Sequence, residues 1–383
     1  MTTPSLRDVI EKASLVVCVG PGGVGKTTIS AVLALHAAAT RRRALVLTID
    51  PARRLADALS LPGLTNDPVA ITGFAKMHPG GSLHALMLDP TATFDHMIAM
   101  LVPDEARRQA LLANRFYQHM SRSLAGTLEY MAVERLHTLT RSGDYNAVVL
   151  DTPPTTNALD FLDAPDRLAV FFNEKIMRWF VPGERASSWT ARLVDRAGAT
   201  AMGLLSKVAG EEFVDETRGF FSAFSDLLGD FRSRGERVGR LLRDPSTTFI
   251  VVTSADAQRL DEAREIDRRL GQSGCHAGAF VVNRVDSPFL PPDVDVERAL
   301  SQATTLLGGS NERERVHDFI ERLEVLRHSR DVSASRHAEA VDLLRAQAGG
   351  RPVFTAPRVP AGQSPRASLL AIYLGLFADA ASE

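Results

Sequence analysis

Gly20-Pro21-Gly22-Gly23-Val24-Gly25-Lys26-Thr27-Thr28 is the stretch of sequence that decides the fold. The apolar residues 15–19 precede it and the helix-forming residues 29–39 follow it, so the order is strand, glycine-rich turn, helix. In this context the pattern G-x-x-x-x-G-K-T is typical of a phosphate-binding loop, and an ordinary glycine-rich turn is the weaker interpretation.

Each part of this loop has a predicted role toward a nucleoside triphosphate. The glycines allow successive backbone N–H groups to point at phosphate oxygens, and the helix N-terminus adds positive potential. Lys26 is expected to reach the β- and γ-phosphates and to act in catalysis, while the Thr27 hydroxyl ligates Mg²⁺. The predicted nucleotide-binding residues of the loop are Gly20, Gly22, Gly23, Val24, Gly25, Lys26, Thr27 and Thr28.

Short apolar runs alternate with helical segments along the rest of the chain. Strands are expected at residues 44–49, 83–88, 145–150, 249–253, 279–282 and 353–355. This alternation predicts an α/β fold with a doubly wound, mostly parallel sheet covered on both faces. Asp50 and Asp151 directly follow two of the strands, so both carboxylates are expected at the sheet edge that carries the loop.

The two aspartates complete the predicted chemistry of the site. Asp151 follows three apolar residues, as does the acid that completes the Mg²⁺ site of phosphate-loop enzymes, and we expect it to support the metal from outside its direct ligands. Asp50 is placed to orient the water that attacks the γ-phosphate. A buried structural aspartate is the alternative interpretation for either residue.

Residues 1–383 are interpreted as a single phosphate-loop domain with two helical inserts. The nucleotide-binding core is predicted at residues 14–90, 141–164 and 244–383, and a helical subdomain for a client or partner at 91–140 and 165–243. Seven of the nine methionines lie from Met77 to Met177, which suits a surface for varied apolar partners or, equally, a plain helical core. The charged residues 308–350 predict two solvent-facing helices, and residues 369–377 a docking helix too short to span a bilayer.

The composition is that of a globular protein, with 45% hydrophobic and 23% charged residues. A formal net charge of −2 gives no electrostatic reason to expect a nucleic-acid partner. Cys18 and Cys275 stand next to apolar residues, which predicts buried thiols in a reducing compartment. Residues 1–13 are too charged for a signal peptide, so a cytoplasmic location is expected.

Three motifs in register resemble the anion-transporting ATPase family, which comprises the arsenite-pump ATPase and the guided-entry ATPase that delivers tail-anchored membrane proteins. They are the phosphate loop, the segment 49–57 (Ile-Asp-Pro-Ala-Arg-Arg-Leu-Ala-Asp), and residues 151–155 with 160–162. Residues 116–117, 125–127, 129–131 and 157–162 look especially like the bacterial branch. The resemblance implies the deviant phosphate-loop NTPase fold with a helical insert subdomain.

The resemblance also implies functional roles. Asp50 matches the aspartate of the first switch, which activates water, and Asp151 the aspartate of the second switch near Mg²⁺. Asn283 matches the asparagine that reads adenine, which makes ATP the expected nucleotide. Family members work as dimers in which ATP closes the interface and reshapes a hydrophobic groove, so a hydrophobic client or membrane protein segment is an expected partner.

Two departures from the family pattern bear on activity. The family carries, two residues after the strand, a lysine that reaches the phosphates of the other subunit, and here that position is Pro21. Losing such a cation can cost on the order of 10³-fold in rate. The chain would then pair with a lysine-bearing paralogue, which we favour, form a slow homodimer, or act as a binding switch. With two cysteines, neither the family's zinc clasp nor its trithiolate arsenite site is expected.

These observations predict a Mg²⁺-dependent ATPase whose hydrolysis cycle opens and closes a dimer. A nucleotide-gated chaperone or scaffold that does not hydrolyse ATP is the alternative from another class. The related partitioning and cell-division ATPases fit less well, because they bind DNA or a membrane surface. Such binding calls for a basic net charge or a basic amphipathic helix near the C-terminal end, and neither is found in this sequence.

Overall fold

The computed structural model describes residues 4–50, 52–72, 80–115, 117–118, 127–153, 217, 228–289, 298, 301–302 and 313–377. Predictions that concern residues 154–162, and most of the predicted insert at 165–243, lie outside these described residues. The boundaries proposed for the core and the helical subdomain therefore stay predictions.

The described residues form one eight-stranded sheet in the order β3-β4-β2-β5-β1-β6-β7-β8. Its strands are β1 (Leu15–Val19), β2 (Arg43–Thr48), β3 (Val69–Ala70), β4 (Ser82–Met87), β5 (Ala147–Asp151), β6 (Thr247–Ser254), β7 (Ala277–Val285) and β8 (Val353–Pro357). All pairings are parallel except that of β3 with β4. The predicted α/β class is confirmed, and β1, which leads into the phosphate loop, lies between β5 and β6 near the middle of the sheet.

Helices cover both faces because every central strand is apolar on both sides. On β1, Val17 and Val19 join one core cluster, while Val16 and Cys18 join the other. The second cluster includes helices α1 (Leu6–Glu11), α2 (Lys26–Ala39), α3 (Arg54–Ala58) and α16 (Pro365–Phe377). The first includes α4 (Pro90–Leu101), α5 (Glu105–Ala113), α7 (Thr127–Arg141), α12 (Leu228–Leu242), α13 (Ala257–Gln272) and α15 (Arg313–Gln347).

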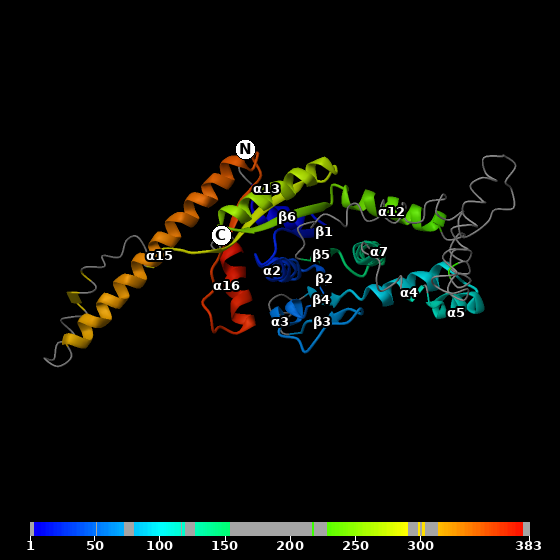
Figure 1. Ribbon diagram of the computed structural model, residues 1–383, viewed down its shortest axis with the longest axis horizontal. Coiled ribbons are helices and arrows are strands. Elements are labelled where there is room, and N and C mark those ends of the chain that lie inside the picture. The colour runs from blue at the N-terminus through cyan, green and yellow to red at the C-terminus, as the bar shows by residue number, and fades with distance from the viewer. Residues whose placement is uncertain are drawn as a thin grey trace, which may run out of the picture.

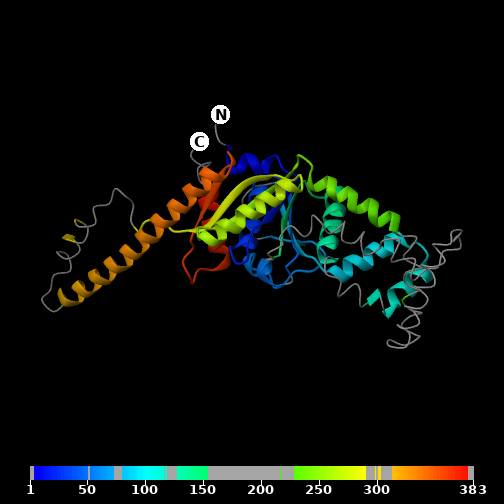
Figure 2. The same ribbon diagram turned by 45° about the horizontal axis from the view of Figure 1, so that its top comes forward.

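The longest helix, α15, projects away from the sheet on the side opposite to α4 and α5 in both views (Figures 1 and 2). Val341 and Leu344 are buried against the sheet, whereas Phe319 and Leu326 are exposed. The predicted pair of solvent-facing helices over 308–350 is wrong for the described part, which is one continuous helix of 35 residues. Residues 313–347 contain no glycine or proline, so nothing in them breaks the backbone hydrogen bonds.

Two methionines of the predicted insert belong to the core. Met97 of α4 and Met131 of α7 are fully buried, while Met100 is 42% exposed. At these positions the plain-core interpretation holds, and a groove formed by the remaining insert stays a prediction.

The C-terminal helix packs as predicted. Leu369, Ile372 and Phe377 are buried, and α16 lies beside α2 (Figure 1). The ring of Phe377 stacks on that of His36 with centroids 3.8 Å apart. Cys18 and Cys275 are both free and buried, in agreement with the prediction. Within the described residues, no helix combines the length and the hydropathy needed to cross a membrane.

Candidate nucleotide-binding site

The phosphate loop needs glycine at two positions that combine a positive φ with no room for a Cβ. Gly20 has φ +153°, and a Cβ there would lie 2.0 Å from the carbonyl oxygen of Val252. Gly25 has φ +91°, and its Cβ would lie 2.3 Å from Nδ2 of Asn283. Gly25 caps α2 without a side-chain hydrogen bond, so the first N–H groups of the helix stay free for an anion.

Lys26, the first residue of α2, is buried within the loop that it serves. Its Nζ donates hydrogen bonds to the carbonyl oxygens of Gly20, at 2.8 Å, and Pro21, at 2.9 Å. Burial lowers the pKa of Lys26 to about 8, although the negative charges of Asp151 and Asp50 act in the opposite direction and raise the pKa. The ammonium group is thus held inside the loop by neutral acceptors that a phosphate can replace.

Asp151 ends β5 below the loop and is completely buried. Its Oδ2 accepts a hydrogen bond of 2.9 Å from the Thr48 hydroxyl, and its Oδ1 one of 3.3 Å from the Ser30 hydroxyl. Burial raises its pKa to about 6, although hydrogen bonds from Thr27 and Thr48 and the charge of Lys26 oppose the rise. The contact with Thr27 places this carboxylate next to the predicted Mg²⁺ ligand, and its role toward the metal stays a prediction.

Asp50 follows β2 and lies at the edge of the same pocket. Its Oδ1 accepts a hydrogen bond of 2.9 Å from the N–H of Ala52, and its Oδ2 pairs with Nη1 of Arg54 at 2.7 Å. The backbone N–H of Asp50 donates to the Thr48 hydroxyl at 3.2 Å. Thr48 therefore links the two predicted aspartates, because the same hydroxyl donates to Asp151.

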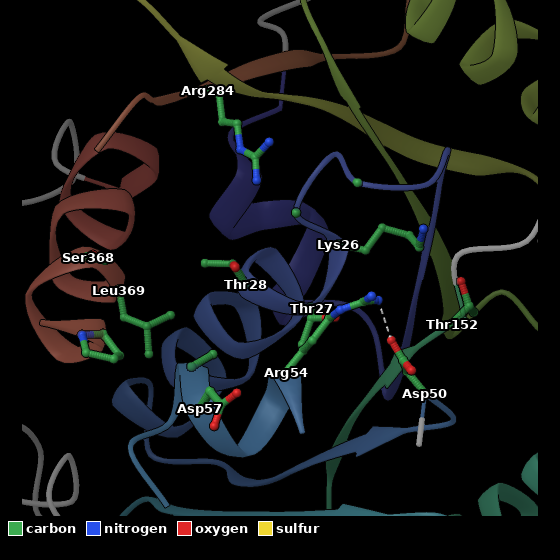
Figure 3. A pocket seen from close by; sticks show the side chains of 14 residues that line it. Lys26, Thr27, Thr28, Asp50, Arg54, Asp57, Thr152, Arg284, Ser368 and Leu369 are labelled. Atoms are coloured by element: carbon green, nitrogen blue, oxygen red, sulfur yellow. Dashed lines mark hydrogen bonds and ion pairs between the residues drawn. The ribbon is translucent and has the colours of Figure 1, made fainter. Parts of the chain in front are cut away.

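A pocket of about 530 Å³ lies over the loop, which is within the usual range for a small-molecule site (Figure 3). One wall is the loop and the start of α2, and the opposite wall is the first part of α16. Asp50 and Thr152 lie at one end, and Arg284 at the other. The residues that line it are Gly23, Gly25, Lys26, Thr27, Thr28, Asp50, Arg54, Asp57, Ala58, Thr152, Arg284, Pro365, Ser368 and Leu369.

Asn283 lies outside this lining, beneath the loop. It is buried, its Nδ2 donates to the carbonyl oxygen of Val24 at 2.8 Å, and its Oδ1 accepts from the N–H of Arg284 at 2.9 Å. In this structure Asn283 supports the loop, and its implied contact with adenine stays a prediction. The next residue, Arg284, has the left-handed backbone angle φ +59° and points into the pocket (Figure 3).

Several residues of the pocket are not predicted from the sequence. Arg54 stands four residues after Asp50 in the second motif, and that spacing was the only signal for it. Arg284 and the α16 residues Ser368 and Leu369 carry no motif, since they reach the pocket through tertiary packing. Gly22 and Val24 belong to the loop but do not line the pocket, Val24 being buried.

The arrangement can bind phosphates and carry out phosphoryl chemistry. Backbone N–H groups at a helix start, a buried lysine and a threonine next to a carboxylate are the parts of a triphosphate and Mg²⁺ site. The oxygen atoms of Thr27 and Asp151 are the donors that a small hard cation prefers. The fold and the site together define a phosphate-loop nucleoside triphosphatase.

Comparison with known proteins narrows this class. A sequence model of anion-transporting ATPases matches residues 13–295, and the chain belongs to the anion-transporting ATPase family. It is 29% identical to the ATPase GET3 of Malassezia globosa over 77% of this chain and 79% of that protein. It is 27% identical to the ATPase GET3A of Arabidopsis thaliana over 78% of this chain and 74% of that protein. The protein is therefore an ATPase, as predicted.

A further relative is the ATPase ASNA1 homolog of Cryptosporidium parvum, 26% identical over 82% of this chain and 76% of that protein. These three relatives come from eukaryotes, so the bacterial branch that the sequence suggested stays a prediction.

Proposed function

We propose that this ATPase binds Mg²⁺-ATP in the pocket between the phosphate loop and α16, and that hydrolysis opens and closes a dimer. The observation that carries the proposal is the convergence of Lys26, Thr27 and Asp50 on one pocket at the N-terminus of α2. Each of the three residues has a hydrogen-bond partner that fits its proposed role. Lys26 donates to carbonyl oxygens of the loop, Thr27 donates to Asp151, and Asp50 accepts from a backbone N–H.

The roles follow from these contacts. Lys26 exchanges the carbonyl oxygens of Gly20 and Pro21 for the β- and γ-phosphates. Thr27 holds Mg²⁺, which supplies positive charge to the phosphate oxygens, and Asp151 supports the metal through Thr27. Asp50 keeps one oxygen on the Ala52 N–H and turns the other toward the attacking water.

The proposed work of the cycle is to bind or deliver a hydrophobic protein segment, such as the anchor of a tail-anchored membrane protein. The resemblance to the guided-entry ATPase supports this proposal, together with the relatives named GET3 and GET3A. ATP-dependent capture of a peptide carrying an apolar helix tests it. Equal capture with ATP, with ADP and without nucleotide would refute a nucleotide-driven client cycle.

Pro21 favours a second candidate, a nucleotide-gated subunit that needs a lysine-bearing paralogue for turnover. The side chain of Pro21 is buried and carries no charge, so it cannot stabilise a transferring phosphoryl group in another subunit. This candidate predicts a heterodimer that hydrolyses ATP where this chain alone only binds it.

Steady-state hydrolysis of Mg²⁺-ATP by the purified chain separates the two candidates, with Asp50→Ala and Lys26→Ala as controls. Turnover that both substitutions abolish supports the first. Tight ATP binding without turnover supports the second, and sedimentation with and without ATP then gives the oligomeric state. A chain that binds no nucleotide would refute both.

A further inference from the structure

The pocket contains a cation that the phosphate loop does not provide. Position 21 is a buried proline, and Lys26 is the only cation of the loop. A transferring phosphoryl group spreads negative charge over its oxygens, and removing one stabilising cation commonly costs orders of magnitude in rate. Arg54, at the start of α3, also lines the pocket, and it lies on the side of Asp50 (Figure 3).

Arg54 is held at this place by the acid expected to orient water. Its Nη1 donates to Oδ2 of Asp50 at 2.7 Å, while 60% of its side chain is exposed. A guanidinium has five N–H donors, so the ion pair leaves others for a phosphate. Only the Arg54 side of this ion pair is exposed, since the Asp50 side chain is 10% exposed, so the guanidinium can turn from the carboxylate to a phosphate oxygen and keep a charged acceptor.

The charges of the two cations already act on each other. The positive charge of Arg54 is one cause of the lowered pKa of Lys26, after burial, which is the largest. The carboxylate of Asp50 acts on Lys26 in the opposite direction. Arg54, Asp50 and Lys26 all line the same pocket over the phosphate loop, and Arg54 and Asp50 are joined there by their ion pair.

We infer that Arg54 supplies within the same chain the cation that Pro21 cannot supply, by moving from Asp50 onto the γ-phosphate of ATP. The move also frees Oδ2 of Asp50 for the attacking water. Arg54 is then a catalytic residue of the hydrolysis, and the chain needs no lysine from another subunit. This inference rests on the proposed function, in which the phosphates occupy the loop and Asp50 orients the water.

The bond changes are those of ordinary hydrolysis. The water oxygen forms a bond to the γ-phosphorus while the bond from that phosphorus to the β–γ bridging oxygen breaks. The electron pair of the broken bond leaves with ADP, and a water proton passes to Asp50 and then to solvent. Arg54 makes and breaks no covalent bond, and it neutralises charge that grows on the γ-phosphate oxygens.

The test compares Arg54→Ala and Arg54→Lys with Arg53→Ala, a matched control on the neighbouring exposed residue, which lies outside the pocket lining. Arg54→Ala should lower kcat for ATP by about 10²–10³-fold and leave ADP affinity within about twofold, and Arg54→Lys should retain part of the rate. Arg53→Ala should match the wild type. Affinity for ADP with aluminium fluoride, which mimics the transferring phosphoryl group, should fall with kcat in Arg54→Ala.

A second comparison shows whether Arg54 acts directly or through Asp50. In an Asp50→Asn background, Arg54→Ala should still weaken binding of ADP with aluminium fluoride, and no further loss would mean that Arg54 only positions Asp50. A kcat of Arg54→Ala within threefold of wild type would overturn the inference. So would a wild-type chain that binds ATP yet hydrolyses it only with a partner, whereas a chain that binds no nucleotide refutes the proposed function itself.

Discussion

The side chain of Asn283 and the backbone of Val24 are joined by a hydrogen bond of 2.8 Å, which ties the end of β7 to the phosphate loop. The amide is buried, and its oxygen is already used by the N–H of Arg284. Cutting such a bond leaves a buried carbonyl without its partner and lets the loop move. The residue that the resemblance assigns to the base therefore supports the phosphate loop in this structure.

Asn283→Ala should weaken binding of ATP and of inorganic tripolyphosphate by the same factor, about tenfold, because the loop rather than the base contact is damaged. Isothermal titration with the two ligands measures it. If only ATP binding weakened, the amide would instead read adenine, as the family resemblance implies.

Nucleotide affinity should fall as the pH rises above about 8. In the nucleotide-free site the pKa of Lys26 is about 8, and the negative charge of a bound triphosphate raises it. Above about pH 8 the free lysine is mostly deprotonated, so binding of the nucleotide takes up a proton. Each further pH unit then costs up to about tenfold in affinity. Titrations in buffers of different ionisation enthalpy detect the proton, and Lys26→Ala should bind weakly without this pH dependence.

Asp151→Asn should stabilise the nucleotide-free protein near neutral pH by about 2 kcal/mol while abolishing Mg²⁺-dependent hydrolysis. The folded pKa of Asp151, about 6, lies above its usual value of 3.8, so the protonated form favours folding below about pH 4 and that contribution is lost as the pH rises through 6. Asparagine mimics the protonated acid at every pH. Denaturant unfolding at about pH 8 and about pH 4 should show the gain at the higher pH only. A variant that is less stable than the wild type at both pH values would contradict this prediction.

His36→Phe should make the fold less sensitive to acid. Burial lowers the pKa of His36 to about 4, below its usual 6.5, so its contribution to stability is present above about pH 6.5 and is lost as the pH falls toward 4. Among the described residues its buried Nε2 has no hydrogen-bond partner, and phenylalanine would keep the stack on Phe377. The free energy of unfolding should therefore fall by about 2 kcal/mol less in the variant over this range. Parallel pH curves for the two proteins would show that His36 does not titrate there.

Local patterns predicted the parts of the fold that depend on neighbours in sequence. The parallel strands and the loop were found because a buried parallel strand is a continuous apolar run and the loop is a spaced motif. The antiparallel strand β3 was missed, since Val69 and Ala70 form too short a run to signal a strand. Its pairing depends on β4, which lies at some distance along the chain.

The site was predictable where a residue follows a strand directly, as Asp50 and Asp151 do. It was not predictable where tertiary packing brings the residue in. An apolar run such as that of α16 indicates that a helix packs, but it does not say that Leu369 will form the wall of a pocket. Arg284 has a left-handed backbone φ, which turns its side chain toward the pocket, and no sequence pattern predicts this φ value.

The packing of α16 over the loop has a consequence for synthesis on the ribosome. The phosphate loop is translated before β6, which borders β1, and α16 is translated after every other helix in the described residues. Because a bound ligand stabilises only the state that can hold it, a nascent chain gains no help from ATP until the opposite wall of the pocket has been made and packed. Nucleotide capture therefore follows the synthesis of α16 and cannot guide the earlier folding of β1 and the phosphate loop.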